Sequence, residues 1–278
     1  MKSFYLITNE SKDPDLIKTV QIEKIITDLG GVITGKVIQS EMTDMVPDKT
    51  DCIVVLGGDG TILRTARNLY GLGIPFLGIN IGHLGYLTEG SQSGAADVFS
   101  KVIGDEYIIE DRMLISGKMR KKDGSVGEKI VSLNDIVLGR SGFMLLINFN
   151  LYVNGELLYN YSADGIIVST PTGSTAYNLS CGGPVVEPTA GLFLITPIAP
   201  HSLNNRSLVL PKEDIIEIEV KRSPDAPQKA AYAAYFDGDA ALEVLPEDRI
   251  IIASEQQVVK LVRLSSRSFL ETLKVKMS

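Results

Sequence analysis

The first hundred residues alternate short apolar runs with amphipathic stretches, and this alternation constrains the fold more than any other feature of the chain. Residues 52–56 form a continuous apolar run rich in β-branched side chains, which is typical of a strand buried on both faces. Residues 61–70 follow with apolar side chains at helical spacing. The same pattern predicts strands at about 3–8, 32–38 and 74–79. It also predicts a helix that begins at Asp13-Pro14 and another over about 94–104. Strands that alternate with helices predict a parallel sheet with helices on its faces.

From residue 107 the sequence changes to the period of two that indicates β-strands. Residues 147–153 alternate apolar and polar side chains, and Asn154-Gly155 then gives a strong hairpin signal. Only residues 173–181 in this half look helical, and a short final helix is expected at about 268–276. The other strands are expected at about 107–120, 128–140, 157–161, 166–170, 192–196, 207–210, 214–220, 230–236 and 249–264. This half is therefore expected to be an all-β layer structure, a sandwich.

The change of pattern predicts two domains with a boundary near residue 105. Residues 1–105 are expected to form a doubly wound-like α/β nucleotide-binding domain. Residues 106–264 are expected to form the β-sandwich, which would bind the substrate. The ligand site is expected in the cleft between the two domains.

The composition excludes several classes of protein. A net charge of −7 argues against a protein that coats nucleic acid, because that role needs a basic face. No apolar run is long enough for a signal peptide or a bilayer span, so we expect a cytoplasmic protein with no membrane partner. The two cysteines, Cys52 and Cys181, can build neither a disulfide framework nor a zinc site.

A glycine-rich loop, Gly57-Gly58-Asp59-Gly60-Thr61, stands between a predicted buried strand and a predicted helix. A parallel sheet presents its ligand crevice at such a position, and glycines let the backbone approach a phosphate chain closely. Arg64, one turn into the helix, could reach a phosphate oxygen. The carboxylate of Asp59 would repel phosphate unless it binds a metal ion or takes a proton from a nucleophile. The alternative is a tight turn in which Asp59 only favours the helix dipole.

The loop matches neither the P-loop pattern nor the G-x-G-x-x-G dinucleotide pattern, which disfavours a dehydrogenase. It resembles the loop shared by NAD kinases, diacylglycerol-type lipid kinases and phosphofructokinases. A second segment, DGIIVSTPTGSTAYNLSCGGP over residues 164–184, resembles the NAD kinase signature nearly residue for residue. Leu133-Asn-Asp-Ile136, residues 78–87 and residues 195–203 also resemble segments of this family. The resemblance spans about residues 52–211 and covers most of both predicted domains.

The resemblance implies an ATP-dependent kinase that transfers the γ-phosphoryl group of ATP to the 2′-hydroxyl of the adenosine ribose of NAD. It implies that Asp59 is the general base and that the phosphate-binding loop consists of Gly57, Gly58, Gly60 and Thr61. The NAD-binding residues that it implies are Asp59, Gly60, Arg64, Asn134, Asp135, Asp164, Thr175, Ala176, Tyr177, Asn178, Leu179 and Ser180. For Asn134-Asp135, the residues alone would favour a turn or a strand-end pair that makes local hydrogen bonds.

The resemblance also implies a homo-oligomer, a dimer or tetramer, and a tail, residues 265–278, that returns to the α/β domain. Phe269, Leu270 and Leu273 of this tail need an apolar partner. A divalent metal ion, Mg²⁺ by expectation, should neutralise the ATP phosphates, because the sequence around the glycine-rich loop contains no lysine.

Two positions depart from the family pattern. Many relatives have an arginine where this chain has Ser162, and a glutamine is common where it has Asp239. Both replacements make the predicted site less basic.

Two other functions compete with that of an NAD kinase: a lipid kinase, which shares the glycine-rich loop, and a catalytically inactive nucleotide sensor. A lipid kinase should show an apolar or basic surface near the site. Asp59 argues against a sensor, because a protein that only binds nucleotide gains nothing from a carboxylate beside phosphate.

Overall fold

The computed structural model describes residues 1–82, 85–140, 146–201, 205–222, 232–264 and 269–277, and the chain divides into two compact units. Unit 1 comprises Met1–Arg112 and Val258–Ser278, and unit 2 comprises Met113–Gln257. The division falls later than the expected residue 105 because β6 (Ile108–Arg120) is one uninterrupted strand that begins in unit 1 and ends in unit 2. In the same way β17 (Arg249–Arg263) carries the chain back into unit 1, so the returning tail is longer than the expected 265–278.

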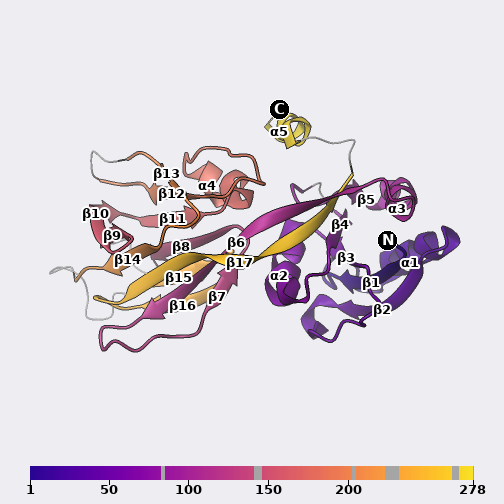
Figure 1. Cartoon of the computed structure of the whole chain (residues 1–278), viewed down its shortest axis with the longest axis horizontal. Coiled ribbons are helices and arrows are strands. Elements are labelled where there is room, and N and C mark those ends of the chain that lie inside the picture. Colours follow the sequence, from indigo (N-terminus) through magenta and orange to yellow (C-terminus); the bar gives the residue numbers. More distant parts are fainter. Residues whose placement is uncertain (83–84, 141–145, 202–204, 223–231, 265–268, 278) are drawn as a thin grey trace. The chain divides into compact units, whose positions relative to one another are not determined.

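Unit 1 is built on a parallel sheet in the strand order β17-β4-β3-β1-β2 (Figure 1). Its own strands are β1 (Ser3–Thr8), β2 (Val32–Ile38), β3 (Cys52–Gly57), β4 (Phe76–Asn80) and the short β5 (Gly90–Ser91). Its helices are α1 (Ile17–Asp28), α2 (Asp59–Leu69), α3 (Ala95–Ile103) and α5 (Phe269–Met277), with 3₁₀ turns η1 (Gln39–Glu41), η2 (Tyr70–Leu72) and η3 (Gln92–Gly94). The continuous apolar runs of β3 and β4 are fully buried, as the sequence predicted.

The helices of unit 1 cover the sheet as the apolar spacing requires. Ile22 and Ile26 of α1 and Phe99 of α3 pack into one core with Phe4, whose ring meets that of Phe99 edge-on at 5.7 Å. Helix α2 lies against β3 and β4, where the side chain of Ile62 fills the space above Gly78. The unit is therefore the expected α/β domain.

Helix α1 begins later than the Asp13-Pro14 pair suggested. Asp13 is buried, and its carboxylate accepts hydrogen bonds from the backbone N–H groups of Lys18 and Thr19 and from the Thr19 hydroxyl. The residues between them form a turn in which Leu16 adopts a left-handed conformation with φ 54°. Asp13 thus satisfies the first N–H groups of the helix from outside it.

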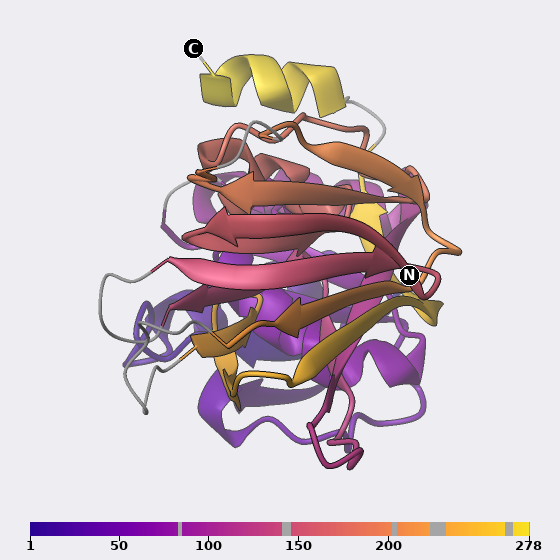
Figure 2. The ribbon, with the colours of Figure 1, turned by 90° about the vertical axis from the view of Figure 1, so that its left-hand side faces the viewer.

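Unit 2 consists of two antiparallel sheets (Figure 2). One contains β10-β9-β14-β17 together with β6 and β7, and the other has the order β13-β12-β11-β8-β15-β16. The bounds are β7 (Ile130–Ser132), β8 (Asp135–Arg140), β9 (Ile147–Val153), β10 (Glu156–Ala163), β11 (Gly165–Ser169), β12 (Leu192–Ile198), β13 (Leu208–Pro211), β14 (Ile216–Val220), β15 (Tyr232–Phe236) and β16 (Ala240–Val244), with the turn η4 (Thr172–Thr175) and the one-turn helix α4 (Tyr177–Ser180). Strand β16 was not expected from the sequence.

Alternate side chains from the two sheets of unit 2 form its core. Ile147, Phe149 and Leu151 of β9 and Ile136 and Leu138 of β8 belong to this one buried cluster. The predicted hairpin joins β9 to β10, and Asn154 and Gly155 both have positive φ, as the turn requires. The sandwich predicted for this half is confirmed.

The tail ends in α5, which belongs to unit 1. Of its apolar side chains, Leu270 is 69% exposed, so this residue lacks the apolar partner that we expected for it. Among the described residues, no helix is long and apolar enough to cross a bilayer. Both cysteines are free thiols.

Candidate active site

The glycine-rich loop has the strand-loop-helix geometry that the sequence predicted. Strand β3 ends at Gly57, Gly58 is the extended N-cap residue, and Asp59 is the first residue of α2. The Thr61 hydroxyl accepts hydrogen bonds from the Gly58 N–H (3.3 Å) and from the Asn9 side-chain amide (2.9 Å). A side chain at Gly57 would collide with Thr61, because an added Cβ would lie 2.3 Å from its hydroxyl oxygen. The loop therefore needs glycine to let the backbone turn directly into α2.

The side chain of Asp59 is held by a neighbouring segment. The backbone N–H of Tyr86 donates to one carboxylate oxygen (2.8 Å), and that of Leu87 donates to the other (3.0 Å). Gly85 permits this approach, because a Cβ there would lie 1.8 Å from the carboxylate. The two hydrogen bonds fix the carboxylate in direction, and the residue as a whole is half-buried. That is the arrangement a general base needs.

A buried ion pair supports this neighbouring segment. The Glu89 N–H donates to the Gly78 carbonyl (2.9 Å), which ties the segment to β4. The Glu89 carboxylate accepts from the Leu264 N–H (2.9 Å) and pairs with the guanidinium of Arg263. Both charged side chains are almost fully buried. The residues that hold Asp59 are thus fixed to the end of β17.

The sequence did not point to Lys12, which lies in the loop after β1. Its ammonium nitrogen lies 2.8 Å from the position that a Cβ of Gly58 would occupy. The sequence around the glycine-rich loop contains no lysine, but in space Lys12 lies beside the loop. Only its spatial neighbourhood could reveal this residue, because it is distant from the loop in sequence. Arg64 is an exposed residue of α2.

In unit 2, Asn134 and Asp135 are organised around a third residue, Asp237. The Asp237 carboxylate accepts hydrogen bonds from the backbone N–H groups of Leu133 (3.0 Å), Asn134 (2.7 Å) and Asp135 (3.3 Å). Asp135 is 4% exposed, and burial together with the charge of Asp237 raises the pKa of its carboxyl to about 7. Asp237 was not predicted as a site residue, although Phe236-Asp237-Gly238 is a visible turn in the sequence.

Four predicted residues come together in one hollow of about 270 Å³. Asn134, Asp135, Ala176 and Tyr177 line it, together with Val137, Tyr235, Asp237 and Gly238. The hollow combines hydrogen-bonding groups with a half-exposed aromatic ring, a lining that suits a nucleoside. Thr175, Asn178, Leu179 and Ser180 are not among the residues that line it.

Other residues of the 164–184 segment hold the wall of this hollow in place. An added Cβ at Gly173 would lie 2.3 Å from the Asn134 carbonyl, so the segment packs directly on Asn134. The buried Asn178 amide donates to the carbonyls of Ser174 (3.2 Å) and Pro184 (3.1 Å) and accepts from the Thr196 hydroxyl (2.7 Å). The role observed for Asn178 is structural.

Asp164 lies near the same wall and is paired with Arg140 of β8 at 2.7 Å. Burial raises the pKa of the Tyr177 hydroxyl, and the neighbouring Cys181 and the charges of Asp135 and Asp164 raise it further. An arginine thus does accompany Asp164, although it comes from β8 and not from the position of Ser162.

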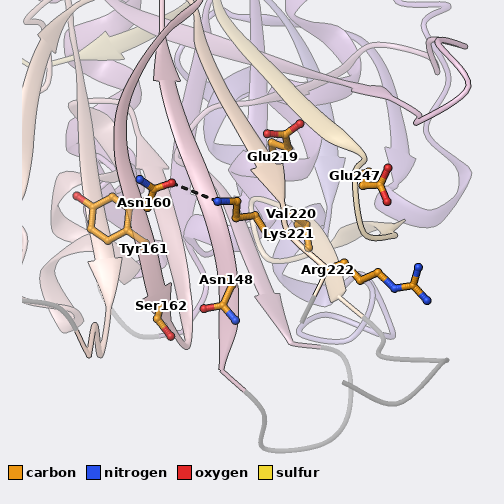
Figure 3. A pocket seen from close by; sticks show the side chains of 9 residues that line it. All are labelled: Asn148, Asn160, Tyr161, Ser162, Glu219, Val220, Lys221, Arg222 and Glu247. Atoms are coloured by element: carbon orange, nitrogen blue, oxygen red, sulfur yellow. Dashed lines mark hydrogen bonds between the residues drawn. The ribbon is translucent and has the colours of Figure 1, made fainter. Parts of the chain in front are cut away.

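A larger hollow of about 650 Å³ lies elsewhere in unit 2 (Figure 3). It contains Ser162 and the opposite charges of Glu219, Glu247, Lys221 and Arg222, and the Lys221 ammonium donates to the Asn160 amide oxygen at 3.4 Å. None of the predicted binding residues lines this hollow. We therefore do not assign it as the nucleotide site, although it is larger than the other one.

Matches to known families cover both units. The model of the ATP-NAD kinase N-terminal domain matches residues 8–107, and that of the ATP-NAD kinase C-terminal domain matches residues 133–264. A curated NAD kinase from Lachnospira eligens is 40% identical over 294 residues, which cover 100% of both chains. The chain belongs to the NAD kinase family. The predicted enzyme class, an ATP-dependent phosphotransferase that acts on NAD, is thereby confirmed, and a lipid kinase is not favoured.

Solved structures agree with this family and with the fold. The chain is similar to an NAD kinase from Archaeoglobus fulgidus in complex with ATP, with a TM-score of 0.77 and 25% identity over 98% of both chains. It is also similar to a yeast NADH kinase complexed with NADH, with a TM-score of 0.81 and 24% identity over 100% of this chain and 87% of that one. The second likeness shows the fold alone.

Proposed function

We propose that Asp59 is the general base of an NAD kinase reaction in this chain. The 2′-hydroxyl oxygen of the adenosine ribose attacks the γ-phosphorus of ATP, and the bond to the β,γ-bridging oxygen breaks. The hydroxyl proton passes to Asp59, and the products are NADP and ADP. The observation that carries this proposal is the fixed carboxylate of the half-buried Asp59 at the start of α2, held by the N–H groups of Tyr86 and Leu87.

The rest of the proposed site binds and orients the substrates. Gly57, Gly58 and the first N–H groups of α2 suit a phosphate chain, because a helix N-terminus favours negative charge. Asn134, Asp135 and Tyr177 bind the nucleoside in the hollow of unit 2. Positioning and charge neutralisation are the main requirements of phosphoryl transfer, and these groups supply the positioning.

Metal dependence remains part of the proposal. The described residues contain no cluster of three or more His, Cys, Asp or Glu side chains that could hold a metal ion. Mg²⁺ is commonly bound by substrate phosphates and few protein ligands, so this chain fits an ion that arrives as the Mg–ATP complex. Such an ion neutralises phosphate charge. The homo-oligomeric state and the cytoplasmic location also remain predictions.

A coupled assay tests the proposed function. Purified protein is incubated with ATP, NAD and Mg²⁺, and NADP is detected with an NADP-specific dehydrogenase. We expect NADP only when ATP is present, and none in excess chelator after metal-free dialysis. The Asp59→Asn variant serves as the matched control for contaminating kinases. Equal NADP formation by this variant and the parent would contradict the assignment of Asp59.

A further inference from the structure

The loop after β1 is fixed beside the glycine-rich loop. The Asn9 N–H donates to the Leu56 carbonyl at the end of β3 (2.9 Å), and the Asn9 side chain bonds to Thr61. The Lys18 ammonium donates to the carbonyl of Lys12 (3.2 Å) and to that of Ile81 after β4 (3.0 Å). The loops that follow three adjacent parallel strands are therefore tied together, with Lys12 among them.

The ammonium of Lys12 occupies space that glycines leave open. It lies 2.8 Å from the position of a Cβ at Gly58 and 3.7 Å from the position of a Cβ at Gly82. A larger residue at Gly58 would displace it. The positive charge is thereby placed directly against the backbone that precedes the N-terminus of α2.

Lys12 differs from other lysines of unit 1. Lys24, Lys36 and Lys101 pair with carboxylates at 2.7–2.8 Å, whereas Lys12 forms no such pair among the described residues. Lys12 is exposed, in a chain whose net charge is −7. A lysine ammonium left unpaired beside a glycine loop and a helix N-terminus suits a multiply charged phosphate chain.

We propose that Lys12 binds the terminal phosphates of the phosphoryl donor. This inference rests on the proposed function and adds a specific donor-binding residue to it. The ammonium neutralises charge on the transferred phosphoryl group and on the leaving diphosphate. The proposed nucleoside contacts of NAD are made by Asn134, Asp135 and Tyr177 of unit 2, so Lys12 is assigned to the donor and not to the acceptor.

Steady-state kinetics with ATP and NAD varied separately test this proposal. We expect Lys12→Ala to raise the KM for ATP by about 10- to 100-fold, because one charge-assisted hydrogen bond is lost. The KM for NAD and the melting temperature should stay at the parental values, and Lys12→Arg should restore part of the ATP affinity. Lys24→Ala removes the same charge from a paired surface position and should change neither KM.

Direct binding separates this proposal from the proposed function. Inorganic tripolyphosphate, measured by calorimetry without NAD, should bind the parent more tightly than Lys12→Ala by the same factor. An unchanged KM for ATP together with unchanged tripolyphosphate binding would overturn the role of Lys12, as would a rise confined to the KM for NAD. A parent protein that forms no NADP would refute the proposed function, and the calorimetry would still decide whether Lys12 binds phosphate.

Discussion

Asp59 of unit 1 is the first residue of helix α2 and Asp135 of unit 2 is the first residue of strand β8, and the two units surround these carboxyl groups differently. Asp59 is half-buried and receives one backbone N–H on each oxygen. Asp135 is almost fully buried beside a second carboxylate, and the pKa of its carboxyl is raised to about 7. The environment of Asp59 fixes the direction of its carboxylate, and the environment of Asp135 makes the charge of its carboxyl group depend on pH near neutrality.

The difference assigns the two residues to different tasks. A base must meet a reacting hydroxyl in a defined geometry, which the fixed carboxylate of Asp59 provides. Asp135 lines the hollow with Asn134 and Tyr177, where its carboxyl can accept a hydrogen bond from a ribose hydroxyl or, when protonated, donate one. We therefore expect mutations in the two units to separate turnover from binding.

The largest effect should come from Asp59→Asn. The amide keeps the size of the side chain but cannot take the proton, so kcat should fall by about 10²- to 10⁴-fold. The interaction strengthens only on the way to the transition state, so the KM for NAD should change little. Steady-state kinetics with NAD and ATP varied separately measure both constants.

Asn134→Ala is the matched comparison from unit 2. It removes a contact that is present in the ground state and the transition state alike, so it should mainly raise the KM for NAD. A near-parental kcat in Asp59→Asn, with weaker NAD binding, would make Asp59 a ligand and would remove the contrast between the units.

The next effect concerns the support of Asp59 in unit 1. Arg263→Ala leaves the buried Glu89 without its positively charged partner, and breaking a buried ion pair in this way costs about 3–5 kcal/mol. The free energy of unfolding, measured in urea, should fall by that amount. Lys101→Ala breaks an exposed pair with Asp97 and should cost less than about 1 kcal/mol. A loss in Arg263→Ala no larger than in this control would show that the pair does not hold the segment beside Asp59.

Local patterns in the sequence were sufficient to predict most of the fold. The continuous apolar runs of β3 and β4 and the Asn154-Gly155 turn each act over a few residues, and each formed as expected. The start of α1 was misplaced because Asp13 caps the helix from beyond a turn. The domain boundary was set by β6, which is continuous through the residues where the pattern changes.

The site was less predictable, because its supporting groups come from distant parts of the chain. Lys12 and the N–H groups of Tyr86 and Leu87 reach the glycine-rich loop only through the order of the parallel strands. Asp237 reaches Asn134 through the pairing of β15 with β8. Single-sequence patterns carry no register between strands, so these neighbours appear only in the structure.

A smaller effect is expected from Tyr177→Ala in unit 2. The ring lines the hollow and is 47% exposed, so a nucleoside can stack on it. Stacking of a base on an aromatic side chain contributes roughly 1–3 kcal/mol, so the dissociation constant for NAD should rise by about 5- to 150-fold. Calorimetry measures this constant, and Tyr177→Phe, which keeps the ring, should bind nearly as well as the parent. Parental affinity in Tyr177→Ala would remove this residue from the binding site.

The last expected effect is on the pH dependence of stability, and Asp135 determines its sign. The pKa of this carboxyl is about 7 in the folded chain, against about 3.9 in an unfolded one. Below pH 4 the group is protonated in both states and has no effect on the unfolding equilibrium. Between about pH 4 and 7 the unfolded chain releases the proton while the folded chain keeps it, so stability falls as the pH rises. Above about pH 7 the full cost of a buried charge beside Asp237 is present.

Asp135→Asn removes this titration and leaves Asp237 in place. The loss of stability between pH 5 and pH 8 should therefore be smaller in Asp135→Asn than in the parent. A difference of about 1 kcal/mol corresponds to roughly 2–4 °C in melting temperature for a domain of this size. Asp97→Asn, at an exposed position of α3, should follow the parental profile. Parallel profiles for Asp135→Asn and the parent would mean that Asp135 is ionised in the folded chain throughout this range, and both units would then present a charged carboxylate to the substrate.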